Sequence, residues 1–246
     1  MKLAILSDIH GNLEAFRAVL TDVGNQDVDE ILNLGDFIDY GPNSNEVSQI
    51  IRNSAIKTII GNHEYIFFDP EEINRFSHNA AVSFKITREN LPRKFVSWIK
   101  SLPKIKILNN RTIRCVHGMP PNSVHEYLSY QSQYRLLNIF RELEERIVFV
   151  GHTHIQDLIK FNESDQKPVR VRLGKEKYKL EENTKYIVNG GSVGQPREKN
   201  KQAKYIIYDT EKELLIPRFV DYEIGKTVAK IRNSDYPDKN ADILLP

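Results

Sequence analysis

The sequence contains almost no cysteine and no long apolar segment. Its 246 residues include one cysteine, Cys115, so an internal disulfide is excluded and a reducing compartment is expected. Charged residues interrupt every apolar run well before the roughly 20 residues that a membrane-spanning helix needs. The short run at residues 3–6 is also too short for a signal peptide. We therefore predict a cytoplasmic protein that does not cross a membrane.

An excess of charge of one sign is also missing. The 35 Lys and Arg residues against 33 Asp and Glu residues leave a net charge of +2, which gives little long-range field to attract nucleic acid. Basic residues do alternate on either side of Gly174, which predicts a β-hairpin with one charged face. They are Lys167, Arg170, Arg172, Lys175, Lys177 and Lys179. A solvated face is the preferred interpretation, and contact with a polyanion is the alternative.

Short apolar runs predict buried β-strands in the first part of the chain. They lie at residues 3–6, 31–34, 57–60, 112–116 and 146–150. Between the first two runs, apolar residues at helical spacing predict a helix that begins after Asn12 and ends at Gly24, and a second helix is predicted near residues 44–53. Strands and helices that alternate over residues 1–60 are typical of a parallel sheet with crossover helices.

The remainder of the chain has a different pattern. Residues 71–100 carry helix-like patches broken at Pro92 and Pro103, so we predict a helical insertion or lid there. After His154 the sequence is rich in predicted strands, from which we expect a second, mainly antiparallel sheet. Since no repeat or linker divides the chain, we expect residues 1–246 to form a single domain.

Polar residues that can bind metal ions follow each of the five early strands. They are Asp8 and His10; Asp36; Asn62, His63 and Glu64; His117; and His152 and His154. Because ligand sites in α/β sheets collect at the carboxyl ends of strands, these motifs can converge on one place. Residues two apart on extended backbone point the same way, so each Asp-x-His or His-x-His pair can address a common point. Carboxylate with imidazole suits Mn, Fe, Zn, Ni or Co.

The distribution of histidine argues against chance. The chain has seven histidines, and only His78 and His125 fall outside the strand-end motifs. A single such motif would more often be ordinary capping or surface polarity, but five in order indicate a metal centre. For His78 and His125 an exposed or hydrogen-bonded role is expected.

Taken together, the motifs resemble the calcineurin-like metallophosphoesterase superfamily. The matching residues are Asp8 and His10; Gly35, Asp36 and Asp39; Gly61, Asn62, His63 and Glu64; His117 and Gly118; and Gly151, His152 and His154. The stretch NGGSVGQPR at residues 189–197 resembles the bacterial and archaeal phosphodiesterase branch. The resemblance implies an α/β fold, a four-layer α/β/β/α sandwich of two mixed β-sheets flanked by helices, with two metal ions at its edge.

The resemblance also implies the ligands and the cofactors. One ion would be held by Asp8, His10, Asp36 and His154, and the other by Asp36, Asn62, His117 and His152, so that Asp36 bridges them. The cofactors would be two divalent transition-metal ions: Mn, Fe, Ni or Zn. A hydroxide that bridges the two ions would attack phosphorus, with no covalent enzyme intermediate.

A catalytic pair is implied as well. His63 would contact the phosphoryl group and protonate the leaving oxygen, and Asp39 would orient His63 and favour its charged form. Helix capping or loop solvation is the alternative for Asp39. Glu64 is either an outer partner of the ligands or a surface charge.

Two positions depart from the serine/threonine protein phosphatases of the superfamily, which carry arginine there. Tyr40 follows Asp39 directly and Ile60 precedes the GNHE motif. Two cations that would grip a dianionic phosphomonoester are thus missing, which favours a singly charged diester. Tyr40, as an aromatic wall, and Arg197, as a replacement cation, are the candidate substrate contacts.

We therefore expect a metal-dependent phosphodiesterase that acts on a small or nucleotide-like phosphodiester. A phosphomonoesterase, including a protein or nucleotide phosphatase, is the first alternative. A nuclease is less favoured, because it would need the basic segment around Gly174 to lie beside the metal centre. A non-catalytic protein-binding scaffold, like the retromer subunit that resembles this family, is disfavoured since the ligand set is complete. The sequence leaves the oligomeric state open.

Overall fold

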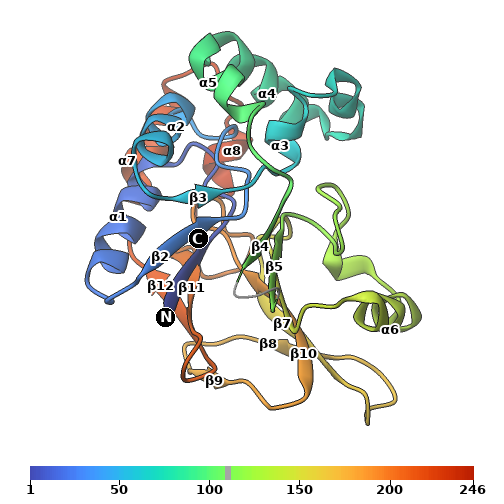
Figure 1. The fold of residues 1–246 in the computed structure, drawn as a ribbon. Helices are drawn as coiled ribbons and strands as arrows, with labels where there is room; N and C mark the ends of the chain where they lie inside the picture. Colours follow the sequence, from blue (N-terminus) through green and yellow to red (C-terminus); the bar gives the residue numbers. More distant parts are fainter. Residues whose placement is uncertain (109–111) are drawn as a thin grey trace.

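Two six-stranded sheets form the centre of the protein in the computed structural model, which describes residues 1–108 and 112–246 (Figure 1). The strand order in the first sheet is β3 (Lys57–Thr58), β2 (Glu30–Asn33), β1 (Lys2–Leu6), β11 (Ala203–Asp209), β12 (Leu214–Val220) and β9 (Tyr178–Lys179). In the second it is β4 (Ile105–Leu108), β5 (Ile113–Val116), β6 (Ile147–Val150), β10 (Thr184–Gly190), β7 (Gln156–Asn162) and β8 (Val169–Arg172). Both sheets mix parallel and antiparallel pairs.

Helices cover the outer face of each sheet, which gives the expected four-layer α/β/β/α sandwich (Figure 1). Beside the first sheet lie α1 (Leu13–Gly24), α2 (Ser44–Asn53) and α5 (Arg93–Ile99), with α7 (Ile224–Arg232) packed against α1, and α6 (Gln133–Glu142) lies beside the second sheet. The short elements are α3 (Asn62–Tyr65), η1 (Pro70–Arg75), η2 (Leu128–Tyr130) and α8 (Lys239–Asp242), and α4 (His78–Asn90) lies between η1 and α5. No helix within the described ranges is long and apolar enough to cross a membrane.

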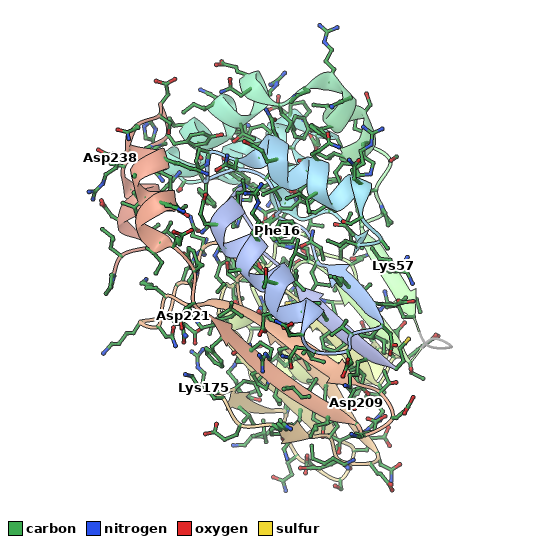
Figure 2. The ribbon with its side chains drawn as sticks, turned by 90° about the vertical axis from the view of Figure 1, so that its left-hand side faces the viewer. Phe16, Lys57, Lys175, Asp209, Asp221 and Asp238 are labelled. Atoms are coloured by element: carbon green, nitrogen blue, oxygen red, sulfur yellow. The ribbon has the colours of Figure 1, made fainter. Side chains whose placement is uncertain are left out.

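The alternating side chains of β1 explain how the layers pack. Leu3 and Ile5 are buried between the two sheets, whereas Ala4 and Leu6 pack on the opposite face against the helices. Phe16 of α1 is fully buried on that helical side, and α1 lies across the strands of the first sheet (Figure 2). Because successive side chains of a strand point to opposite faces, one apolar run can serve two cores.

The early part of the chain follows the sequence prediction. β1, β2 and β3 pair in parallel, with α1 and α2 as the connections. Asn12 accepts a hydrogen bond from the Ala15 N–H and so caps α1, as predicted. Residues 71–100 are helical, and α4 ends at Asn90, immediately before the Leu91–Pro92 break. Pro92 lacks the N–H that a continued helix would need.

The prediction of a second, mainly antiparallel sheet from the strands after His154 is only partly confirmed, because these strands are divided between the two sheets. β9, β11 and β12 belong to the first sheet, and β7, β8 and β10 join the second. β11 inserts beside β1 in antiparallel orientation, so the ends of the chain share one sheet. A period-two pattern specifies which side chains of a strand are buried but not which strand lies beside it.

The basic hairpin around Gly174 is likewise not formed. β8 pairs with β7, and β9 pairs with β12, so the segment crosses from one sheet to the other. Arg170 forms an ion pair with Asp157 and donates a hydrogen bond to the Leu128 carbonyl. The alternating charges do mark an exposed strand face, but Arg170 is already neutralised within the fold.

Candidate metal centre

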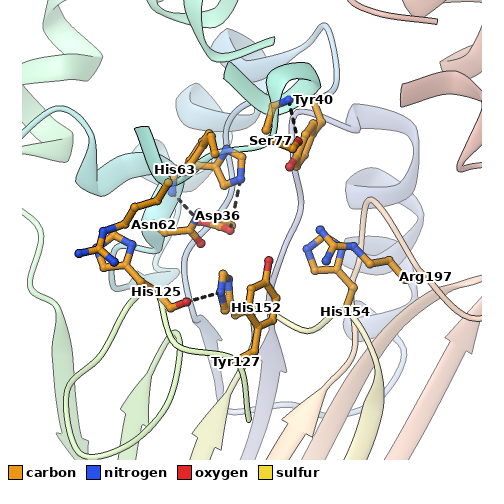
Figure 3. A pocket seen from close by; sticks show the side chains of 13 residues that line it. Asp36, Tyr40, Asn62, His63, Ser77, His125, Tyr127, His152, His154 and Arg197 are labelled. Carbon is orange, nitrogen blue, oxygen red and sulfur yellow. Dashed lines mark hydrogen bonds and ion pairs between the residues drawn. The ribbon is translucent and has the colours of Figure 1, made fainter. Parts of the chain in front are cut away.

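The strand-end residues of both sheets meet at one edge of the molecule. Asp8 and His10 follow β1, Asp36 follows β2, and Asn62 and His63 open α3 after β3. From the second sheet, His117 follows β5, and His152 and His154 follow β6. All of these side chains are buried. Residues from five separate strand ends therefore share one site, part of which is drawn in Figure 3.

Ligand-type atoms of these residues form three close groups, within each of which all atoms lie within 4.8 Å of one another. The groups are Asp8, His10 and His154; Asp36, His117 and His152; and His10, Asp36 and His63. The Nε2 atoms of His10 and His154 are 3.2 Å apart, and His154 Nε2 is 3.2 Å from Asp8 Oδ1. His117 Nε2 is 3.1 Å from Asp36 Oδ2. The first two groups each contain three of the four residues of a predicted ligand set.

Backbone carbonyls fix the orientation of four imidazoles. Nδ1 of His10, His117 and His154 donates to the carbonyls of Ile38, Leu34 and Gln195, at 3.1, 2.8 and 2.6 Å. A carbonyl can only accept, so each Nδ1 carries a proton, and in the neutral ring the lone pair is then on Nε2. His152 uses the other nitrogen, since its Nε2 donates to the His125 carbonyl at 2.9 Å. Histidines that bind metal ions are held in this way by their second ring nitrogen.

The backbone of the site is in an unusual conformation. Positive φ angles between 47° and 72° occur at Asp8, His10, Asp36, Asp39, Tyr40, His152 and His154. Non-glycine residues rarely adopt this left-handed conformation, and it is concentrated at functional sites where the surrounding structure enforces it. The glycine before Asn62 is also required, because a Cβ on Gly61 would lie 2.1 Å from Asp36 Oδ1.

Glu64 organises the loops beneath the site. Its Oε2 accepts the N–H groups of Asp36 and Gly61 at 2.7 and 2.9 Å, and its Oε1 accepts those of Phe37 and Ile38 at 2.9 and 3.2 Å. The side chain is fully buried, and burial together with the Asp36 carboxylate raises the pKa of Glu64 to about 7. Of the two alternatives, Glu64 is thus an outer partner of the site and not a surface charge.

His63 points away from Asn62 and pairs with Asp39. His63 Nδ1 lies 2.6 Å from Asp39 Oδ2, and its Nε2 lies 3.9 Å from Asp36 Oδ2. Burial alone would lower the pKa of His63, but the Asp36 and Asp39 carboxylates outweigh it, so the pKa is raised. The raised pKa favours the charged form of an imidazole that lies near the ligand-type atoms. Asp39 itself is fully buried, so loop solvation does not describe it.

A cavity of about 370 Å³ opens beside these residues. Its wall includes Asp36, Tyr40, Asn62, His63, Arg75, Phe76, Ser77, Ala80, His125, Tyr127, His152, His154 and Arg197. Tyr40, His154 and Arg197 lie to the right in Figure 3, and Asn62 and His125 to the left. The sequence analysis missed Arg75, Phe76 and Tyr127, which belong to no strand-end motif. Tyr127 stacks on His152 at 3.9 Å between ring centroids.

Two buried polar atoms indicate that the site is built for a cation. Asn62 Oδ1 is buried and forms no hydrogen bond within the described part of the chain, and buried His117 Nε2 lies 3.1 Å from the Asp36 carboxylate. Buried polar atoms without a partner are rare because they cost about 1–3 kcal/mol each. An amide oxygen and an imidazole nitrogen, next to carboxylate oxygens, are donors that a divalent transition-metal ion accepts. The residues present therefore fit a metal.

Comparison with known proteins decides the family. The sequence model of the calcineurin-like phosphoesterases matches residues 1–190. The chain belongs to this family. It is a metallophosphoesterase, a hydrolase of phosphoester bonds with a dimetal-type His/Asp site.

Individual relatives match nearly the whole length of the phosphoesterase chain. An uncharacterized protein of Methanocaldococcus jannaschii is 33% identical over 240 residues, which cover 96% of this chain and 94% of the relative. The crystal structure of a metallophosphoesterase from Sphaerobacter thermophilus has 31% identity, a TM-score of 0.82 and coverage of 99% and 98% of the two chains. A hypothetical protein of Pyrococcus horikoshii shares the fold with 20% identity, a TM-score of 0.78 and coverage of 99% and 97%.

Proposed function

We propose that this phosphoesterase is a phosphodiesterase that hydrolyses a small or nucleotide-like phosphodiester with two divalent metal ions. The observation that carries the proposal is the pair of ligand-type groups around Asp8 and Asp36, with the unpaired Asn62 Oδ1 beside them. When bound, the ions would supply an activated water as nucleophile and neutralise charge on the phosphoryl oxygens.

The predicted ligand sets remain the assignment that we propose. Asp8, His10, Asp36 and His154 would hold one ion, and Asp36, Asn62, His117 and His152 the other. Support comes from the free ring nitrogens, Nε2 in His10, His117 and His154 and Nδ1 in His152, which the carbonyl contacts leave available. Mn, Fe, Ni and Zn all suit this mixture of nitrogen and oxygen donors.

His63 would donate the proton that the leaving oxygen needs. The Asp36 and Asp39 carboxylates outweigh burial and raise its pKa, which favours the protonated ring, and Nε2 faces the cavity while Nδ1 is engaged by Asp39. An alkoxide or phenoxide that leaves without a proton is a poor leaving group, and it is poorer the higher the pKa of the corresponding alcohol or phenol. His63 is therefore the proposed general acid and Asp39 its orienting partner.

The charges of the cavity favour a diester over a monoester. Of the two arginines in its wall, Arg75 is paired with Glu72 at 2.7 Å from Nε to Oε2. Arg197 has no ion pair or hydrogen bond to any residue that the structure describes. One unpaired guanidinium matches the single negative charge of a diester better than the double charge of a monoester. Tyr40, in the same wall, is the proposed aromatic contact.

Four further predictions stand as proposals. The chain would form a single domain over residues 1–246. Within it, residues 71–100 would act as a lid over the cavity, since Arg75, Phe76, Ser77 and Ala80 from this segment line it. Nucleic acid stays disfavoured, because none of the basic side chains between Lys167 and Lys179 lines the cavity in the described part of the chain. A cytoplasmic location rests on the single cysteine, which is buried.

The test compares a diester with its matching monoester. Metal-stripped protein is reconstituted with Mn, Ni, Fe or Zn, and hydrolysis of bis(4-nitrophenyl) phosphate is measured against 4-nitrophenyl phosphate. We expect the larger kcat/KM for the diester. A preference for the monoester would contradict the diester assignment and make a phosphatase the better description. Two bound ions per chain without turnover of either ester would favour the scaffold alternative.

A further inference from the structure

A buried network of hydrogen bonds surrounds Asp39 and extends far from the metal centre. Asp39 Oδ1 accepts three hydrogen bonds, from the Tyr40 N–H at 2.7 Å, Ser83 Oγ at 2.7 Å and Thr87 Oγ1 at 3.1 Å. Its Oδ2 faces His63 Nδ1 at 2.6 Å. With one oxygen saturated, the carboxylate is held in one rotational position, and its other oxygen is aimed at the imidazole.

The donors themselves are fixed by the C-terminal part of the chain. Because the single proton of the Thr87 hydroxyl goes to Asp39, the neighbouring Tyr236 hydroxyl donates to Thr87 Oγ1 at 2.9 Å. Asn240 Nδ2 lies 3.3 Å from Ser83 Oγ, and its Oδ1 accepts a hydrogen bond from Asn79 Nδ2 at 2.7 Å. Thr87 and Asn240 are almost completely buried, with 1% and 2% exposure.

Asn240 also supports the strained backbone beside the acid pair. Its Nδ2 donates to the Tyr40 carbonyl at 2.9 Å. Asp39 and Tyr40 are consecutive residues with φ angles of 72° and 57°, a conformation that persists only where neighbouring groups enforce it. α8 and Tyr236 lie beyond residue 190, where the match to the family ends. Figure 1 shows α8 beside the α4 end of the molecule.

We propose that Thr87, Ser83 and Asn240 are positioning residues that hold the Asp39–His63 pair in register for proton transfer to the leaving oxygen. The inference rests on the proposed role of His63 as general acid. It assigns to α4 and to the C-terminal α8 a task in catalysis, although neither carries a metal ligand. Small displacements of a catalytic group cost large factors in rate, so loss of this support lowers kcat and leaves substrate binding unchanged.

The test uses the dependence of rate on the leaving group. Metal-reconstituted protein hydrolyses methyl 4-nitrophenyl phosphate, which has a good leaving group, and methyl phenyl phosphate, which has a poor one that needs the acid. Thr87→Val and Asn240→Ala are expected to lower kcat for the phenyl ester about tenfold or more, and for the nitrophenyl ester less than about threefold. KM and bound metal should stay unchanged, and Thr87→Ser, which keeps the hydroxyl, should restore the phenyl ester rate.

Matched controls separate positioning from folding. Lys85→Ala on α4 and Asp242→Ala on α8 alter exposed side chains of the same helices and should leave both rates unchanged. If Asn240→Ala does not fold, Tyr236→Phe, which removes only one hydroxyl, gives the same comparison. Equal losses on both esters, or no loss, would overturn the positioning role.

His63→Gln distinguishes the two proposals. If this variant shows the leaving-group effect and Thr87→Val does not, the network has no positioning role and the acid assignment stands. If His63→Gln itself slows both esters equally, the general-acid role is wrong, and the positioning proposal is overturned with it. The metal content of each variant, measured in parallel, excludes loss of the ions as the cause.

Discussion

The Nε2 atoms of His10 and His154 are 3.2 Å apart although 144 positions separate the two residues in the chain. Each ring donates its Nδ1 proton to a carbonyl, and burial lowers the pKa of both histidines, which favours neutral rings with the lone pair on Nε2. Two lone pairs that face one another repel unless a cation lies near both. The pair of histidines thus argues for an ion more directly than either histidine does alone.

Asp36→Asn should abolish turnover while the protein stays folded. The carboxylate contributes to two of the ligand-type groups, and an amide lacks the charge that holds a divalent ion. Metal content, measured by mass spectrometry after reconstitution, should fall together with activity, and circular dichroism should be unchanged. Asp221→Asn, at an exposed position, is the control. Full activity in Asp36→Asn would contradict the shared-ligand assignment.

Glu64→Gln should destabilise the protein by about 2–6 kcal/mol. One of the two oxygens becomes an NH₂ group, which leaves two of four buried N–H groups without an acceptor at about 1–3 kcal/mol each. Urea unfolding measures the loss. Glu89→Gln, on the exposed face of α4, should change the free energy of unfolding by less than about 0.5 kcal/mol. A Glu64→Gln protein as stable as the parent would show that the loops do not depend on this carboxylate.

Arg197→Gln should raise KM for the diester about tenfold and leave kcat nearly unchanged, because one charge-assisted contact worth about 1.4 kcal/mol is removed from substrate binding. Lys199→Gln, two residues along the same loop, is the matched control, since Lys199 is exposed and absent from the cavity wall. The measurement is KM and kcat of the parent and both variants, from steady-state kinetics on bis(4-nitrophenyl) phosphate. An unchanged KM would remove Arg197 from the substrate contacts.

The stabilising effect of Asp22 should disappear in acid. Partial burial opposes ionisation, but hydrogen bonds from Arg218 and Tyr205 outweigh it and lower the pKa of Asp22. A lowered folded-state pKa means that the contribution is present above the unfolded pKa, about 4, and is lost as the pH falls through the folded value. Asp22→Asn should therefore cost about 1 kcal/mol at pH 7, where solvent screens the pair.

Urea unfolding of the parent and of Asp22→Asn at pH 7 and pH 3 checks the sign, because the difference between the two proteins should shrink at pH 3. Asp235→Asn, an exposed carboxylate, controls for general charge effects. A gap that widens toward acid would show that the pKa of Asp22 is raised in the folded protein.

Local sequence patterns were sufficient for the elements and for the candidate ligands. The spacing of apolar residues, together with capping residues, located β1, α1 and α2. A strand with one buried face repeats apolar residues every two positions, and a helix repeats them every three or four. The strand-end motifs identified Asp8, Asp36 and His117 without any structure, since polar residues directly after a buried strand can lie only at the edge of the sheet.

Only the tertiary structure decided which strands are neighbours and which distant residues serve the site. Nothing in the pattern of β11 shows that it inserts beside β1, because strand pairing depends on partners remote in sequence. For the same reason Arg75, Thr87 and Asn240 carried no signal: a threonine or asparagine in a helix is an ordinary residue until folding brings it to Asp39. Functional residues that lie close together in the chain can be predicted from the sequence. Residues that support the site from distant parts of the chain cannot, because only folding brings them there.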